Sequence, residues 1–224
     1  FSGTGSIDAS GLYTPVNIAT PTQTNAVVIR ATNGSCNTNY GVTVYNKATI
    51  NPIANQCEGA VINPLGSDVN GGAFSGTGVS GGPYPTAYIF TAPTPGGSSQ
   101  NYNITLTNGP SGCGDLATVT VYKSFTVTPA NPVATCDITA VPFTSTLTTT
   151  VWNVTTGTGS FSASTGTNTN YNPANIATPT QSTATTVTAT NGECIVTRNI
   201  TNYNDNTITT PNNTAVCDAA TPTI

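Results

Sequence analysis

The sequence has no histidine and very little charge: 5% of its 224 residues are charged, with four Lys and Arg against eight Asp and Glu. Without histidine it lacks the usual general base, the serine and cysteine triads and the commonest metal ligand. Catalysis would have to rest on carboxylates, and no two of the eight are close enough in sequence to suggest a paired acid and base. We therefore expect no enzyme activity and no cofactor.

Basic residues and long apolar runs are equally scarce. A net charge of −4 and a pI near 4.2 argue against nucleic acid as a partner, because its recognition needs a basic stripe to displace counterions. No run approaches the 18 apolar residues of a membrane-spanning helix, so no membrane insertion is expected. The lack of methionine predicts a mature or internal fragment.

What the chain does have is internal repetition, with a period of about 80 residues. The heptapeptide Asn17–Gln23 returns unchanged at Asn175–Gln181. Three further landmarks recur at the same period: Cys36, Cys113 and Cys194; Cys57, Cys136 and Cys217; and Tyr45, Tyr122 and Tyr203. We therefore predict a tandem array.

Alternation of apolar and polar residues dominates each repeat, as in 102–107 and 117–122. This period of two is typical of half-buried strands, which suit the branched side chains of Thr and Val. Pro and Gly interrupt nearly every window long enough for a helix. We predict an all-β chain of Ig-like β-sandwich domains in a linear array, with Trp152 in a sandwich core.

Asn-Gly pairs at 33–34, 108–109 and 191–192 favour hairpin turns, and a cysteine follows each of them at the beginning of a last strand. Those strands end at the recurring tyrosines, and the short polar segments after them mark boundaries. The predicted organisation has four parts: a partial unit at 1–47 (the C-terminal part of a domain), complete units at 48–124 and 125–205, and a partial unit at 206–224 (the N-terminal part of a domain).

Regularly spaced cysteines in small, polar units predict disulfides and an oxidising, extracellular setting. Pairing within units links Cys57 with Cys113 and Cys136 with Cys194, and leaves Cys36 and Cys217 to partners outside the fragment. The rival scheme links Cys36 with Cys57, Cys113 with Cys136 and Cys194 with Cys217. Parity favours the rival, whereas the distance between successive units in an array favours the first, which we predict.

Each repeat carries a cysteine followed by a small or acidic residue (Cys57-Glu58-Gly59, Cys136-Asp137, Cys217-Asp218), then alternating strands, an Asn-Gly turn with its cysteine, and a closing segment such as Thr118-Val-Thr-Val-Tyr122. This pattern resembles the Ig-like and PKD-like repeats of very large bacterial surface adhesins, common in Bacteroidota. The resemblance implies β-sandwich arrays that are secreted to the cell surface and extend as stalks or filaments. It carries no ligand site over.

Acidic residues beside the cysteines raise the question of calcium, since Glu58, Asp137 and Asp218 share one position in the repeat. Calcium takes six to eight oxygen ligands, and no dense loop of Asp and Asn is present. We predict solvated carboxylates and no metal site.

Two functional hypotheses remain. The first is a structural and adhesive segment of an extracellular bacterial surface filament or stalk, whose partner is itself, head to tail, as neighbouring repeats or subunits. The alternative is a carbohydrate- or protein-binding module that contacts surface glycans through Tyr84, Tyr88 and Phe90.

Overall fold

The computed structural model describes residues 5–20, 22–83, 86–109, 113–177 and 179–205. Every regular element in these ranges is a β-strand, which confirms the predicted all-β class. None of the described residues forms a helix long and apolar enough to cross a membrane.

The chain divides into two compact units. The first holds Phe1–Ser124 together with the short segment Gly192–Cys194, and the second holds Phe125–Asn191 and Ile195–Ile224. This division keeps residues 1–47 with 48–124, whereas the repeat pattern predicts a boundary after residue 47. The predicted partial unit at 206–224 lies outside the described residues.

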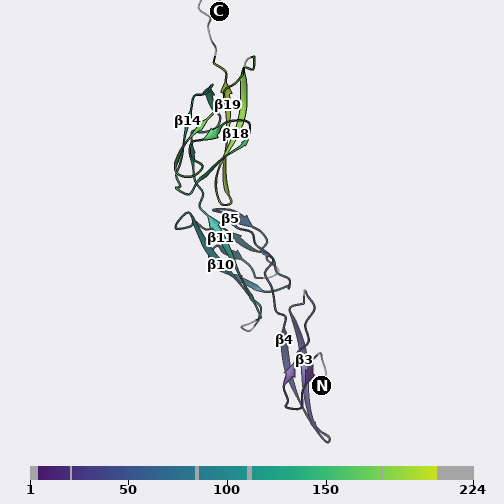
Figure 1. Cartoon of the computed structure of the whole chain (residues 1–224). Helices are drawn as coiled ribbons and strands as arrows, with labels where there is room; N and C mark the ends of the chain where they lie inside the picture. Colours follow the sequence, from purple (N-terminus) through teal and green to yellow (C-terminus); the bar gives the residue numbers. More distant parts are fainter. Residues whose placement is uncertain (1–4, 21, 84–85, 110–112, 178, 206–224) are drawn as a thin grey trace, which may run out of the picture. The chain divides into compact units, whose positions relative to one another are not determined.

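Residues 48–124 form a seven-stranded sandwich of two sheets. One sheet has the order β5-β11-β10-β7, formed by Gln56–Cys57, Asp115–Tyr122, Ser99–Thr107 and Ala73–Ser75. The other has the order β6-β9-β8, formed by Val61–Ile62, Tyr88–Thr91 and Val79–Gly81. All pairs are antiparallel except β5 with β11, which run parallel. Figure 1 labels β5, β10 and β11 of this sandwich. Two sheets in this strand order define an Ig-like sandwich.

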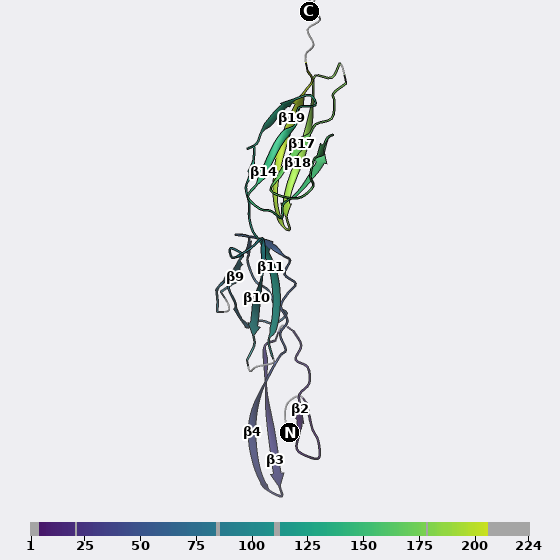
Figure 2. The ribbon, with the colours of Figure 1, turned by 60° about the vertical axis from the view of Figure 1, so that its left-hand side comes forward.

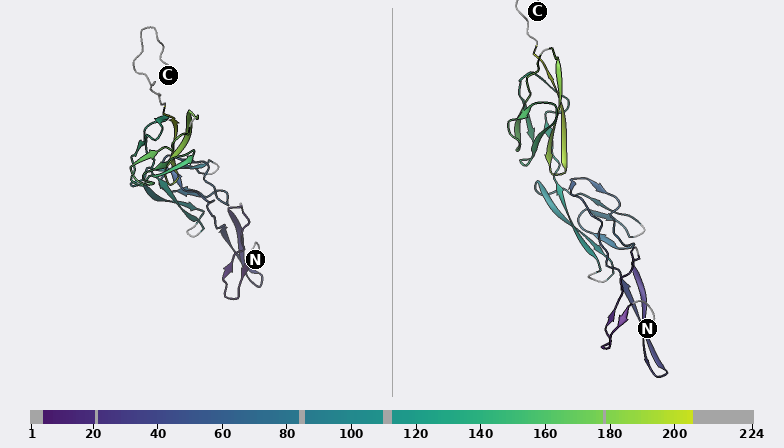
Figure 3. Two further views of the ribbon diagram at one scale, coloured as in Figure 1. Left: turned by 45° about the horizontal axis from the view of Figure 1, so that its top comes forward. Right: turned by 45° about the vertical axis from the view of Figure 1, so that its right-hand side comes forward.

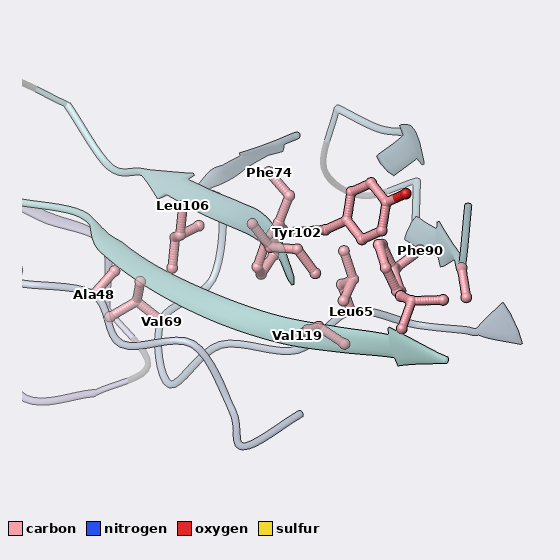
Figure 4. Close-up of a cluster of buried hydrophobic side chains, with 11 residues drawn as sticks. Ala48, Leu65, Val69, Phe74, Phe90, Tyr102, Leu106 and Val119 are labelled. Atoms are coloured by element: carbon pink, nitrogen blue, oxygen red, sulfur yellow. The ribbon is translucent and has the colours of Figure 1, made fainter. Parts of the chain in front are cut away.

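The core of this sandwich follows from the alternation along its long strands. On β10, Tyr102, Ile104 and Leu106 are buried, while the residues between them are exposed. Figure 4 shows Tyr102 and Leu106 gathered with Phe74, Phe90 and other apolar side chains in one cluster. The Tyr102 hydroxyl donates a hydrogen bond to the carbonyl oxygen of Thr94 at 3.1 Å, so the polar end of this ring is satisfied.

The second unit contains a complete eight-stranded sandwich. One sheet has the order β12-β14-β17-β16, formed by Val127–Thr128, Val141–Ser145, Asn168–Asn172 and Ser160–Phe161. The other has the order β13-β19-β18-β15, formed by Val133–Cys136, Cys194–Tyr203, Ser182–Asn191 and Val151–Thr156. The two layers are visible in Figure 3, and β13 again runs parallel to the last strand.

Trp152 lies in the core of this second sandwich, as predicted. Only 2% of its surface is exposed, and its indole N–H donates to the carbonyl oxygen of Gly166 at 2.9 Å. Its ring packs against Phe143 and Phe161, with centroids 5.9 and 5.7 Å apart. A buried Trp between the two sheets is the usual anchor of an Ig core, and here it lies on β15, the fourth strand of this sandwich.

Residues 5–47 contain two antiparallel pairs: β1 with β2 (Ser6–Ile7, Tyr13–Thr14) and the ten-residue strands β3 and β4 (Thr24–Asn33, Cys36–Tyr45). The β3–β4 hairpin is the counterpart of β10–β11 and β18–β19, the last two strands of the sandwiches (Figure 2). Val28 and Tyr40 on this hairpin are 39% and 71% exposed.

The last two residues of the exact heptapeptide repeat accept the same hydrogen bonds in both copies. The backbone N–H of Asn46 donates to the carbonyl oxygen of Gln23, and that of Asn204 donates to the carbonyl oxygen of Gln181, each at 2.8 Å. The side-chain amide of Asn46 donates to the backbone carbonyl oxygen of Thr22, and that of Asn204 donates to the backbone carbonyl oxygen of Thr180. The chain therefore leaves β4 and β19 through the same hydrogen bonds.

Candidate functional site

The three Asn-Gly pairs form hairpin turns, as predicted, and their glycines adopt the left-handed region, with φ of +59° at Gly34, +74° at Gly109 and +55° at Gly192. This region strains any residue with a Cβ. Two of the turns differ from the third in what lies against them.

A closing tyrosine packs on the turn glycine of the following repeat in two places, and we call this contact the joint. A methyl group on Gly109 would lie 2.2 Å from Cδ1 of Tyr45, and one on Gly192 would lie 2.3 Å from Cδ1 of Tyr122. All four residues belong to the first compact unit. At both joints the tyrosine ring occupies the space that a side chain on the turn would need.

Buried hydrogen bonds surround the first joint. The Asn108 side chain is fully buried and donates to the carbonyl oxygen of Asn46 at 2.7 Å. The Gln23 side chain donates to Asn108 Oδ1 at 2.7 Å, and the Ala48 N–H donates to the carbonyl oxygen of Cys113 at 3.0 Å. The buried Asn108 side chain therefore has a hydrogen-bond donor in Gln23 and an acceptor in Asn46.

The second joint is closed by a disulfide between Cys57 and Cys194, whose Cα atoms are 4.9 Å apart. Cys57 pairs with Tyr122 in the parallel register of β5 and β11, so it lies beside the closing tyrosine. Sγ of Cys194 is 3.3 Å from the carbonyl oxygen of Tyr122. One covalent bond and one aromatic contact therefore meet at the end of β11.

This disulfide shows that the predicted pairs Cys57 with Cys113 and Cys136 with Cys194 are wrong. Cys57 lies beside the last residue of β11, while Cys113 precedes its first residue, and an eight-residue strand separates those positions by about 26 Å. A disulfide requires Cα atoms within about 7 Å. Cys136 likewise pairs with Tyr203, at the opposite end of β19 from Cys194.

The other described cysteines are free thiols: Cys36 and Cys136 are exposed and Cys113 is half-buried. The rival pairs of Cys36 with Cys57 and Cys113 with Cys136 are therefore not formed either. Cys217, predicted to find its partner outside the fragment, lies outside the described residues.

The carboxylates near the joint accept backbone and hydroxyl hydrogen bonds. Glu58 accepts from the Thr94 hydroxyl at 2.5 Å and from the Ser124 N–H and hydroxyl at 3.0 and 2.9 Å. Asp115 accepts from the Ile50 N–H at 2.8 Å. Within the described ranges no three His, Cys, Asp or Glu side chains gather as a metal site would require. These carboxylates hold the links between strands in place.

Acid should weaken this hydrogen bonding at Glu58. Its bonds from Thr94 and then Ser124 lower the pKa of Glu58 below its ordinary 4.5. A lowered folded-state pKa stabilises the fold above the unfolded-state value, and this stabilisation is lost as the pH falls through the folded-state pKa. We expect Glu58→Gln to reduce stability at pH 7, and this loss should shrink progressively as the pH is lowered below 4.5, in a series of urea titrations. Glu193→Gln, at an exposed position, is the control, and a loss that does not change with pH would contradict the assignment.

The joint predicts a difference between two chemically identical substitutions. Gly109→Ala should cost about 1–2 kcal/mol for its positive φ and about 1–3 kcal/mol more because the Tyr45 ring must move. Gly34→Ala has the same backbone cost, but its methyl group would meet no atom within 4 Å. Thermal unfolding of the two variants measures this difference, and equal destabilisation would argue against the packed joint.

Two of the three candidate ligand residues, Tyr88 and Phe90, lie among the described residues, and they differ in exposure. Phe90 has no exposed area and belongs to the core, and Tyr84 lies outside the described residues. Tyr88 is half-buried, packs on Phe74 with centroids 5.5 Å apart, and borders a cavity of about 330 Å³ that Leu65 also lines. Phe90 therefore cannot contact a ligand in this fold.

No family model and no curated protein matches the chain. Among solved structures, an endo-fucoidan hydrolase of glycoside hydrolase family 107 is 11% identical over 92% of this chain, with a TM-score of 0.29, and this chain covers 37% of that structure. Extracellular domains 3–5 of Drosophila OTK are 13% identical, with a TM-score of 0.35, over 76% of this chain and 67% of theirs. Titin domains I67–I69 are 9% identical, with a TM-score of 0.31, over 82% and 75%.

At these scores the likenesses carry no argument about this chain, and the strand order of the two sandwiches defines the fold. That order and the disulfide describe a structural or binding module of the Ig-like class.

Proposed function

We propose that this chain is a structural and adhesive segment of an extracellular bacterial surface filament or stalk, built from Ig-like sandwiches in series. The observation that carries this proposal is the recurrence of the joint. The same contact between closing tyrosine and turn glycine is made by Tyr45 with Gly109 and by Tyr122 with Gly192. A repeated connection of this kind suits a protein whose task is reach and resistance to pulling.

The disulfide supports the mechanical part of the proposal. Cys57 and Cys194 are 137 positions apart in sequence, so the bond encloses most of both sandwiches. A force applied to the two ends of the chain passes through this bond, which shields the enclosed residues from extension. Disulfides persist in oxidising compartments, which supports an extracellular location. The bacterial surface is proposed from the resemblance of the repeats to adhesin repeats.

Single-molecule force spectroscopy tests this function. With the chain tethered at both ends, the oxidised protein should extend without releasing the residues between Cys57 and Cys194. Reduction should add roughly 450–490 Å of contour length, at 3.3–3.6 Å per residue. A Cys57→Ser, Cys194→Ser variant should show the full length without reductant. Extension at forces of only a few piconewtons in the oxidised chain would contradict a mechanical role.

One observation favours the alternative, a carbohydrate- or protein-binding module. The cavity beside Tyr88 is within the size range of small-ligand sites, and its lining combines the aromatic residues Phe74 and Tyr88 with the polar residues Ser67 and Asn70. Glycan-array binding that weakens in Tyr88→Phe, which keeps the ring packing on Phe74, would support this function. Absence of binding to any glycan or extracellular protein tested would count against it.

A further inference from the structure

Each half of the joint occurs three times in the chain, but only two joints are made among the described residues. The third closing end consists of Tyr203, Cys136 and Gln181, and we call it the open end. The third turn consists of Asn33, Gly34 and Cys36, and we call it the open turn. All six residues are exposed. Each of them has a counterpart that makes a contact in at least one completed joint: the tyrosine and glycine in both, the Gln–Asn hydrogen bond in the first and the disulfide in the second.

The open end is built like the closed one. Cys136 pairs with Tyr203 in the same parallel register that places Cys57 beside Tyr122. The Asp137 N–H donates to the carbonyl oxygen of Tyr203, as the Glu58 N–H does to that of Tyr122. Yet Tyr203 is 50% exposed and Cys136 is an exposed free thiol. The ring and the sulfur are thus presented together without the turn that covers their counterparts.

The open turn has the complementary shape. Gly34 has the same positive φ as Gly109 and Gly192, but no atom lies within 4 Å of the position of a methyl group on it. Cys36 stands in the repeat where Cys194 stands, and it too is an exposed free thiol. Asn33 is the counterpart of Asn108, which accepts a hydrogen bond from Gln23. Gln181 is the matching glutamine at the open end, because the heptapeptide repeat is exact.

We infer that the open end binds the open turn of a second copy of this chain. The Tyr203 ring packs on Gly34, the Gln181 side chain donates to Asn33, and Cys136 forms a disulfide with Cys36 of the second copy. The bond forms by exchange with a small-molecule disulfide: two thiols lose two protons and two electrons, and one external disulfide is reduced to two thiols. This inference deepens the proposed function, on which it rests, by naming the partner and the residues of an end-to-end contact.

Isotope mixing distinguishes a bond between copies from one within a chain. Equal amounts of ¹⁵N-labelled and unlabelled protein are mixed, oxidised with glutathione disulfide and digested with trypsin without reduction. The four basic residues place Cys36 in peptide 31–47, and both Cys136 and Cys194 in peptide 124–198, which the Cys57–Cys194 bond keeps linked to 48–123. We expect labelled 31–47 linked to unlabelled 124–198 with its attached 48–123, and the reverse, with fragmentation placing the new bond on Cys136, in preference to Cys36–Cys36 or Cys136–Cys136 links.

Links only between peptides of one label, or a random mixture of all pairs, would overturn the inference. Cys36→Ser and Cys136→Ser should each abolish the covalent link between copies, whereas Cys113→Ser should retain it.

A second measurement tests the contact without the bond. In a Cys36→Ser background, which cannot form the link between copies but keeps the Cys57–Cys194 bond oxidised, analytical ultracentrifugation of the Tyr203→Ala variant should show association roughly tenfold weaker than the Cys36→Ser parent, since an aromatic ring no longer packs on the turn. Tyr40→Ala removes another exposed tyrosine, away from the turn, and should leave association unchanged. Equal effects of the two variants would contradict the proposed packing. A negative result in this association measurement would not affect the force-spectroscopy result. The end-to-end contact and the mechanical function are therefore tested separately.

Discussion

The double variant Cys57→Ser, Cys194→Ser should lose up to about 5 kcal/mol of stability relative to the oxidised wild type. Closing a loop of 137 positions removes this much conformational entropy from the unfolded chain in the chain-entropy account. The loss should appear as a lower urea midpoint, followed by tryptophan fluorescence, because Trp152 lies within the loop. It should equal the loss that reductant causes in the wild type.

The matched control for this experiment is a substitution at an exposed free thiol. Cys36→Ser at monomer concentration should leave the urea midpoint within experimental error, since its side chain is exposed and forms no disulfide. Reductant should shift the midpoint of this variant as much as that of the wild type. An oxidised double variant as stable as wild type would show that the bond adds nothing to the fold.

Truncating Trp152 to alanine should destabilise the second unit by about 3–5 kcal/mol. The substitution removes a ring that is 98% buried against Phe143 and Phe161, and it leaves a cavity that this small core cannot fill. It also leaves the carbonyl oxygen of Gly166 without its indole donor. Differential scanning calorimetry should show the transition of the second unit at a much lower temperature.

Trp152→Phe is the control, because it keeps an aromatic ring between Phe143 and Phe161 but loses the hydrogen bond. We expect it to cost about 1–3 kcal/mol. The transition of the first unit, whose core contains no part of Trp152, should hardly move in either variant. An alanine variant that melts within a degree of wild type would place Trp152 outside the core.

Local patterns were enough to predict much of the fold. The alternation along 102–107 set the inward face of β10, and the Asn-Gly pairs set hairpins at the observed turns, because both depend on neighbours in sequence. Trp152 followed from its place in an alternating run. The joint residues were visible as landmarks: the tyrosines and the turn glycines recur with the repeat, although nothing in the sequence showed that they touch.

The cysteine pairing could not be predicted in the same way. It depends on the parallel register between β5 and β11, a contact between strands about 65 residues apart, which places Cys57 at the end of β11 and not at its beginning. Nor could the sequence alone show that Phe90 is fully buried while Tyr88 is half-buried. Both lie on the short strand β9, and only the packing of the two sheets decides that Phe90 points into the core.

Mapping the disulfides of the oxidised chain tests the central claim most directly, namely that a covalent bond ties one repeat to the turn of the next. In a tryptic digest without reduction, Cys57 lies in peptide 48–123 and Cys194 in peptide 124–198. The account predicts these two peptides linked, with fragmentation placing the bond between Cys57 and Cys194. Separate peptides, each closed by an internal Cys57–Cys113 or Cys136–Cys194 bond, would contradict it.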